Sequence, residues 1–214
     1  NKKFYILLLA MVALAGFLFY RQIMRANQIT VQRTDTPLIS ANAIFIPASD
    51  SEQMIGNPGA TTTIVEFIDL GCNRCISLHT TIKDFVTKHP QAIKIVWKDN
   101  VKSGFFSNYT LAHQAAFCAG KQNKFWEFID IAIANKNNLL EPGLKKIAQG
   151  LNLDLEPWWQ CANSSETKQA IMSSVQMADQ LGIKSLPAIF VNNKLINTGK
   201  DVNIEEMLGS FIGK

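Results

Sequence analysis

The alternation of apolar and polar stretches along the chain predicts a domain built from both strands and helices. Residues 61–70 form a β-branched apolar run that is typical of a buried strand, and residues 92–97 alternate as a second strand would. Residues 72–88, between them, have helical character and end before His89-Pro90. A strand, a helix and a strand of these lengths indicate a right-handed parallel crossover.

The pattern changes after the second strand. Residues 108–181 contain no convincing strand pattern and predict several helices, among them 111–118 and 124–131. These helices are separated by glycine and proline residues, namely Gly120, Pro142-Gly143, Gly150 and Pro157. The middle of the chain is therefore expected to be a helical insertion.

Strand character returns near the C-terminal end. Residues 188–191 are apolar, and Asn192-Asn193 is expected to turn the chain into a hairpin with residues 194–197. A closing helix is expected over residues 202–212. The order of elements thus indicates an α/β fold interrupted by helices.

The N-terminal part predicts a separate segment. Residues 4–20 form an uninterrupted apolar run after Lys2 and Lys3, at the short end for a helix that rises about 1.5 Å per residue across a bilayer. Ala13-Leu14-Ala15 resembles a signal-peptide cleavage site, so a cleaved signal peptide is an alternative. Because the apolar run continues past this site, we expect a single transmembrane signal anchor over residues 1–25.

A polar stretch follows the expected anchor. Residues 26–56 contain Pro37 and Pro47 and predict a linker, with a possible edge strand at residues 43–46. Basic residues flank the apolar run on both sides, so the positive-inside rule does not orient it.

Composition excludes one broad class of function. The chain has 214 residues and 47% hydrophobic residues, enough for one domain with a substantial core. Its formal net charge is +4, and its basic residues form no dense run with interleaved aromatic residues. Nucleic-acid binding therefore has little support.

The candidate chemistry lies at Cys72-Asn73-Arg74-Cys75, directly after the first predicted strand. A helix that begins there presents unpaired N–H groups and a partial positive charge, which favour a thiolate. Arg74 adds a cation near the sulfurs. Two cysteines at this spacing can close a small disulfide ring with the first sulfur exposed and the second shielded. The motif therefore indicates a redox site.

Two alternatives to redox chemistry remain open. His79 lies four residues past Cys75, so the motif is also half of a possible zinc site, although a structural zinc site needs four ligands. The remaining cysteines, Cys118 and Cys161, are far from each other and from any neighbouring histidine. A purely structural Cys72–Cys75 disulfide is the second alternative. We expect His79 to be an ordinary helix residue beside the site, and no metal or organic cofactor.

Cys118 and Cys161 form a second candidate pair. Both fall in the helical insertion, each near a predicted helix end. A bridge between them would stabilise the folded state by roughly 4 kcal/mol in the chain-entropy model, because it closes a long loop. Two buried free thiols are the alternative, because free cysteine packs as a small hydrophobic residue.

Several segments in the same order resemble DsbA-like thiol–disulfide oxidoreductases. These are Val65-Glu66-Phe67 before the motif, then residues 115–120, 124–127 and 181–192. The resemblance implies a thioredoxin-like fold over residues 57–214, with a helical insertion at about residues 105–182. The chain departs from the family between the cysteines, where Asn73-Arg74 replaces a dipeptide that usually contains proline. The redox potential is therefore not determined by the resemblance.

The resemblance also implies roles for individual residues. Cys72 would be the exposed nucleophile and Cys75 the resolving thiol. Pro187 matches the family's cis-proline and would hold the backbone of Leu186 beside the sulfurs for an extended substrate. A proline at the start of a strand is the alternative for Pro187.

Three further residues complete the expected site. Glu66 matches a buried acid of the family, which can shuttle a proton for the resolving thiol. The alternative is that Glu66 is a strand residue that faces solvent. Asn73 and Arg74 are expected to contact the substrate and to tune the stability of the thiolate.

Together these observations predict a membrane-anchored enzyme that donates its disulfide to reduced secreted or membrane proteins. Because disulfides persist outside the cytoplasm, we expect the domain on the outer face of a prokaryotic cytoplasmic membrane. The resemblance implies reoxidation by a quinone-linked membrane partner of the DsbB or VKOR-like kind. Two alternatives are a reductase of the same fold that serves cytochrome or metal-site maturation, and a non-catalytic subunit of a membrane complex.

Overall fold

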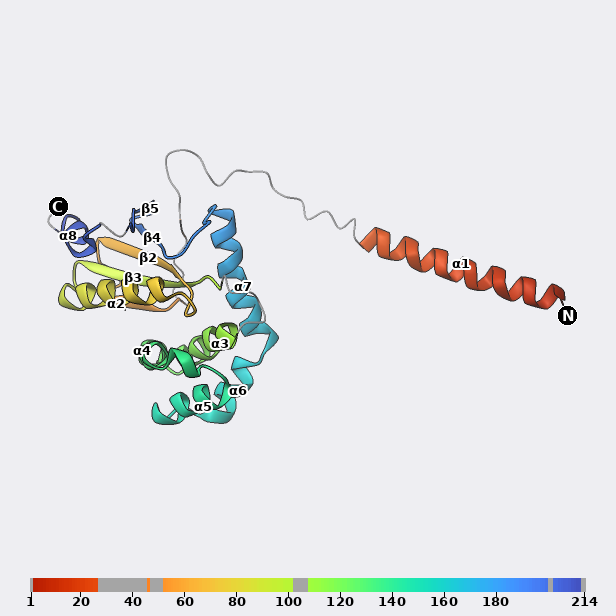
Figure 1. Cartoon of the computed structure of the whole chain (residues 1–214), viewed down its shortest axis with the longest axis horizontal. Coiled ribbons are helices and arrows are strands. Elements are labelled where there is room, and N and C mark those ends of the chain that lie inside the picture. The colour runs from red at the N-terminus through yellow and green to blue at the C-terminus, as the bar shows by residue number, and fades with distance from the viewer. Residues whose placement is uncertain (1, 27–45, 47–51, 102–107, 200–201, 213–214) are drawn as a thin grey trace. The chain divides into compact units, whose positions relative to one another are not determined.

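The computed structural model describes residues 2–26, 46, 52–101, 108–199 and 202–212. The chain divides into two compact units, residues 1–37 and 38–214. The first unit contains helix α1, Lys2–Ala26 (Figure 1). In the part of the chain that the structure describes, no helix is both long and apolar enough to cross a membrane. The edge strand expected at residues 43–46 lies outside the described residues, apart from Ile46.

The second unit is built on one mixed sheet. Among its described residues, five strands follow the order β1-β3-β2-β4-β5. The strands are β1 (Met54–Gly56), β2 (Thr62–Ile68), β3 (Ile93–Asp99), β4 (Ala188–Val191) and β5 (Lys194–Leu195). The β2 and β3 strands pair in parallel, as the crossover predicts, and the other pairs are antiparallel.

The edge of the sheet differs from the expectation at one point. Residues 54–56 were expected to belong to a linker, whereas they form β1 and pair with β3. Gly56 makes this close pairing possible, because it has φ +99° and a Cβ atom there would lie 2.3 Å from the carbonyl oxygen of Ile93. A strand of three residues has no periodicity that a sequence pattern can detect.

The helices account for most of the remaining described residues. The crossover helix is α2 (Asn73–Lys88), and the closing helix α8 (Ile204–Gly209) is shorter than expected. The insertion between β3 and β4 is helical throughout its described part, as predicted (Figure 1). It comprises α3 (Asn108–Gly120), α4 (Phe125–Ala134), η1 (Lys136–Asn138), α5 (Glu141–Gly150), α6 (Leu155–Ala162) and α7 (Ser165–Gln180).

The two central strands are buried on both faces over most of their length, and each has an apolar middle section. Ile64 and Ile95 face the larger core, together with the buried face of α2 and most of the insertion. Val65 and Phe190 face a smaller core that includes Ala178 of α7. The predicted hairpin turn is also present, because Asn192 and Asn193 both adopt left-handed backbone angles that asparagine tolerates.

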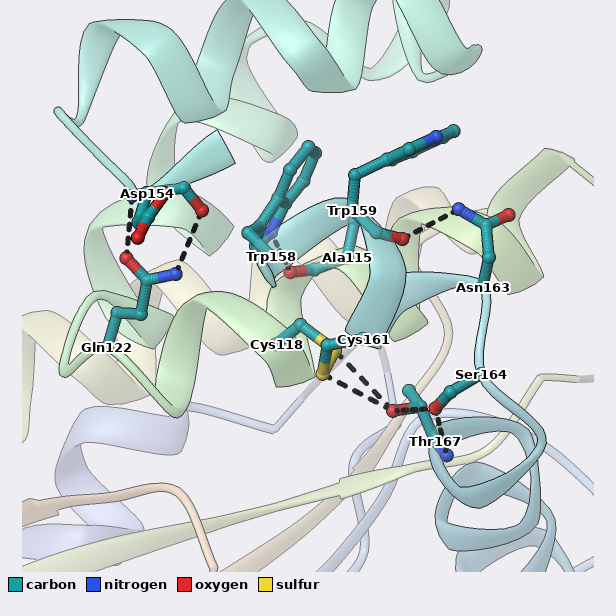
Figure 2. Close-up of a disulfide and its surroundings, with 10 residues drawn as sticks. All are labelled: Ala115, Cys118, Gln122, Asp154, Trp158, Trp159, Cys161, Asn163, Ser164 and Thr167. Carbon is teal, nitrogen blue, oxygen red and sulfur yellow. Dashed lines mark hydrogen bonds between the residues drawn. A yellow bond between two sulfur atoms is a disulfide. The ribbon is translucent and has the colours of Figure 1, made fainter. Parts of the chain in front are cut away.

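A disulfide joins two helices of the insertion. Cys118 near the end of α3 is bonded to Cys161 in α6, and the Thr167 hydroxyl donates toward these sulfurs at 3.4 and 3.5 Å (Figure 2). Beside the bridge, the indole N–H of Trp158 donates to the carbonyl of Ala115 at 2.9 Å. The bridge, the hydroxyl and the buried indole together fix α6 against α3.

A buried charge cluster joins the insertion to the sheet. His113 of α3 is fully buried, and its Nδ1 lies 2.5 Å from Oδ1 of Asp99 at the end of β3. Its Nε2 lies 3.7 Å from Oδ1 of Asp69, just after β2. Burial alone would lower the pKa of His113, but hydrogen bonds and charges from Asp69 and Asp99 raise it from 6.5 to about 9.

The raised pKa of His113 predicts a pH-dependent stability. The imidazolium stabilises the folded state fully below pH 6.5, and this contribution is lost as the pH rises through about 9. Between these values the free energy of unfolding should fall by on the order of 3 kcal/mol. Urea unfolding from pH 6 to pH 10 measures this free energy. The fall should disappear in His113→Gln and persist in His89→Gln, an exposed histidine; a flat wild-type profile would contradict the assignment.

The second disulfide predicts a stability effect of its own. Replacing both Cys118 and Cys161 by alanine removes a cross-link over 43 positions. Thermal unfolding should shift to lower temperature by the equivalent of about 4 kcal/mol in the chain-entropy model. The matched control is Cys72→Ala/Cys75→Ala, whose bridge spans only 3 positions and should matter less. Equal melting temperatures for C118A/C161A and wild type would show that this bridge does not stabilise the fold.

Candidate redox site

The end of β2 and the start of α2 bring the two motif cysteines together in a disulfide. Cys72 is the N-cap residue of α2, and its Sγ accepts a hydrogen bond from the backbone N–H of Cys75 at 3.1 Å. The Cα atoms of the pair are 5.2 Å apart. Cys72 is half-buried, whereas Cys75 is fully buried. Of the two sulfurs, that of Cys72 is therefore the one open to an attacking thiolate.

The position of Cys72 also favours its thiolate once the disulfide opens. The first N–H groups of a helix have no partner within the helix and carry partial positive charge. One of them, from Cys75, already points at the sulfur of Cys72. A thiolate at such a position has a lowered pKa and is a good leaving group.

The two residues between the cysteines are held by two different parts of the chain. The guanidinium of Arg74 donates to the carbonyl oxygen of Thr198, between β5 and α8. The side-chain oxygen of Asn73 accepts from the ammonium group of Lys136 in η1. The structure therefore adds a cation that the sequence analysis missed, because Lys136 lies 63 positions from Asn73.

A second buried pair joins β2 to α2. Glu66 of β2 is completely buried, and its Oε2 lies 2.6 Å from Nδ1 of His79. His79 follows Cys75 by one helical turn on the buried face of α2. The expectation of an ordinary helix residue is therefore wrong for His79, whose ring also stacks on Trp126 and meets Trp97 edge-on. The spacing of four residues between Cys75 and His79 was the signal that both lie on one face of the helix. The sequence pattern was interpreted only as a possible zinc ligand at His79.

The strand β4 begins near the end of β2 that leads to the two motif cysteines. Its first residue, Ala188, is paired with Phe67 near the end of β2, and the peptide bond between Leu186 and Pro187 is cis. Pro187 is buried and Leu186 is half-buried. The antiparallel pairing places this segment at the end of the sheet from which the chain leads to Cys72. Leu186 packs against the same core cluster that contains Cys75.

The described side chains do not assemble a metal centre. Within these residues, no group of three or more histidine, cysteine, aspartate or glutamate side chains is arranged to hold a metal ion. The sulfurs of Cys72 and Cys75 are bonded to each other. His79, the residue considered as a third zinc ligand, is paired with Glu66.

Comparisons with known structures support the fold. A thioredoxin-like oxidoreductase from Silicibacter pomeroyi DSS-3 superposes with a TM-score of 0.66 at 23% identity, covering 77% of this chain and 91% of the other. The thiol–disulfide exchange protein α-DsbA2 from Wolbachia pipientis gives a TM-score of 0.66 at 19% identity, covering 76% and 86%. The chain thus shares the fold of DsbA-like proteins.

Comparisons of sequence identify the family. A curated relative, the Na⁺/H⁺ antiporter NhaA 3 of Salinispora tropica, is 25% identical over 152 residues, which is 71% of this chain and 23% of the relative. The chain spans about a quarter of the length of the curated relatives that it matches. A family model described as thioredoxin matches residues 48–210, most of the chain. The chain therefore belongs to the thioredoxin family.

Proposed function

We propose that the protein is an extracytoplasmic thiol–disulfide oxidoreductase that donates its Cys72–Cys75 disulfide to cysteines of secreted or membrane proteins. One observation carries the proposal: an accessible sulfur at a helix N-cap is bonded to a fully buried one. A structural disulfide needs no such asymmetry, whereas exchange requires one sulfur that is attacked and one that leaves. The DsbA-like fold is consistent with the same chemistry.

The exchange follows from this geometry. A substrate thiolate attacks Sγ of Cys72, a mixed disulfide forms, and Cys75 leaves with the electron pair of the broken bond. A second substrate thiolate then attacks the substrate sulfur of the mixed disulfide, and Cys72 leaves as a thiolate at the helix N-terminus. The substrate loses two electrons and two protons and gains a disulfide. The enzyme ends as a dithiol.

Glu66 is proposed to exchange a proton with Cys75 during this cycle. A fully buried thiolate is costly, so the leaving Cys75 needs a proton close by. The Oε2 atom of Glu66 contacts His79, whereas its Oε1 is buried and has no hydrogen-bond partner among the described residues. His79 lies one turn beyond Cys75 on the buried face of α2, so its contact with Glu66 supports a position of this carboxylate near the resolving sulfur.

The substrate is proposed to bind as an extended segment beside Leu186. The cis bond to Pro187 precedes β4, so the backbone of Leu186 lies outside the paired part of the sheet. Backbone groups at such a position can pair with an added strand. Asn73 and Arg74 are exposed next to Cys72 and would line the same approach.

The direction of exchange is proposed to be oxidation, with a quinone-linked membrane partner of the DsbB or VKOR-like kind restoring the disulfide. The helix N-terminus at Cys72 supports this direction, because stabilising the thiolate makes a disulfide more oxidising. A measured reduction potential distinguishes the alternatives. A value nearer to about −120 mV supports an oxidase, and one nearer to about −270 mV supports a reductase.

Residues 1–25 are proposed to attach the chain to a membrane. The apolar run and its helical conformation support this part of the proposal. After alkaline extraction of membranes, the full chain should stay in the pellet, whereas a chain of residues 27–214 should be soluble. Recovery of the full chain in the supernatant would contradict an anchor, and loss of about 15 residues from the mature protein would indicate a cleaved signal peptide.

Capture of substrates tests the exchange chemistry directly. In Cys75→Ala the lone Cys72 thiolate forms a mixed disulfide by attacking a disulfide of an oxidised partner, whose other sulfur leaves as a thiolate. These adducts should accumulate, because the attack by Cys75 that would resolve them is missing. We expect at least about ten-fold more adduct than in wild type, given the usual advantage of an intramolecular thiol. Non-reducing gels and mass spectrometry of the linked peptides measure it. Cys72→Ala is the matched control; if it traps as many partners as Cys75→Ala, Cys72 is not the nucleophile.

A further inference from the structure

The turn of residues 69–72, which leads into Cys72, is held by hydrogen bonds among its own residues and by one from helix α3. The carboxylate of Asp69 accepts from the backbone N–H of Gly71 at 2.8 Å, and the carbonyl of Asp69 accepts from that of Cys72 at 3.0 Å. The N–H of Leu70 has a different acceptor, Nε2 of His113, at 3.0 Å. His113 is therefore the contact from outside that fixes the middle of this turn.

The helical insertion approaches the turn at two points. Besides His113, helix α3 brings Tyr109 so close to Gly71 that a Cβ atom on Gly71 would lie 3.0 Å from its ring. Both residues lie on α3, one turn apart. The position of Cys72 therefore depends on the insertion as well as on β2 and α2.

His113 cannot satisfy all of its neighbours in one protonation state. Nε2 accepts from the N–H of Leu70 only while it carries no proton. The charged groups that face the ring are Asp69 after β2 and Asp99 at the end of β3, and α3 has no charged residue other than His113. Both carboxylates favour the imidazolium, with Nε2–H then directed at Asp69.

We propose that His113 is a positioning residue for the nucleophile Cys72. Its neutral ring holds the turn of residues 69–72 through the N–H of Leu70, and its protonated ring gives up that bond and donates to Asp69. Because Asp69 also binds the N–H groups of Gly71 and Cys72, the change is transmitted to the nucleophile. The reactivity of Cys72 then depends on a residue in the insertion. This inference rests on the proposed role of Cys72 as the nucleophile.

The structure offers a route for the proton that His113 gains or loses. Nδ1 of His113 contacts Asp99, whose side chain is 12% exposed while that of His113 is 0% exposed. Asp99 also lines a cavity of about 250 Å³ together with Glu52 and Lys98. A proton can therefore pass between the cavity and the imidazole through Asp99, without opening of the core.

The test measures alkylation of Cys72 by iodoacetamide in the reduced full-length protein from pH 5 to pH 10. In wild type the rate should follow two ionisations, one of the Cys72 thiol and one that changes the rate roughly five-fold, as expected from one hydrogen bond. His113→Gln keeps an amide oxygen for the N–H of Leu70 and cannot take up a proton. Its profile should show the thiol ionisation alone.

Two comparisons make the outcome decisive. His89→Gln, at an exposed histidine, should retain both ionisations. Asp99→Asn removes one of the carboxylates that favour the imidazolium, so the second ionisation should move to lower pH by about one unit or more. A single ionisation in wild type, a second one that survives in His113→Gln, or one that Asp99→Asn leaves unmoved would overturn the proposal. Asp99→Asn also provides the test should His113→Gln fail to fold.

The assay separates this inference from the proposed function. Iodoacetamide needs no protein substrate, so the positioning role can be measured even if Cys75→Ala captures no partner. Absence of capture with an intact two-step profile would refute protein disulfide exchange and leave the role of His113. Capture with a one-step profile would do the reverse.

Discussion

The parallel pairing of β2 with β3 is the interaction on which the rest of the structure depends. Its register places Ile68 beside Asp99, so both strands end at the same edge of the sheet. Because both faces are covered, most side chains of these strands are buried. Where β2 ends, the chain must leave the sheet within a few residues to begin α2. The Cys72–Cys75 disulfide lies at this point, where a buried strand meets an exposed helix N-terminus.

The helical insertion serves this edge rather than forming an independent body. It reaches the motif through Lys136 beside Asn73, and it reaches the strand ends through His113. Within the insertion, the Cys118–Cys161 bridge links α3 to α6. The two disulfides thus have different surroundings. The first lies between packed helices, and the second lies at a helix N-terminus, where one of its cysteines is only half-buried. The same covalent bond is structural in the first setting and suited to exchange in the second.

Local patterns in the sequence predicted much of the fold and the pairing of Cys72 with Cys75, whereas long-range polar contacts could not be predicted in this way. The central strands, α2, the all-helical insertion and the Asn192-Asn193 turn each have a signal within about ten residues. The cis bond before Pro187 was expected only through the family resemblance. His79 and His113 were missed in their observed roles because a histidine in an apolar stretch does not reveal which distant carboxylate it meets. Their partners are supplied by sheet register, which no short pattern encodes.

The cluster of Asp69, Asp99 and His113 has a consequence for how the chain can evolve. Its three members come from three separate segments and are all buried, so loss of the histidine leaves two carboxylates in the core without their shared cation. Such positions are strongly coupled, and the effects of substitutions there do not add. A lineage that replaces the histidine should therefore replace at least one aspartate in the same interval. Within relatives of this chain, the three positions are expected to co-vary as a unit rather than to drift independently.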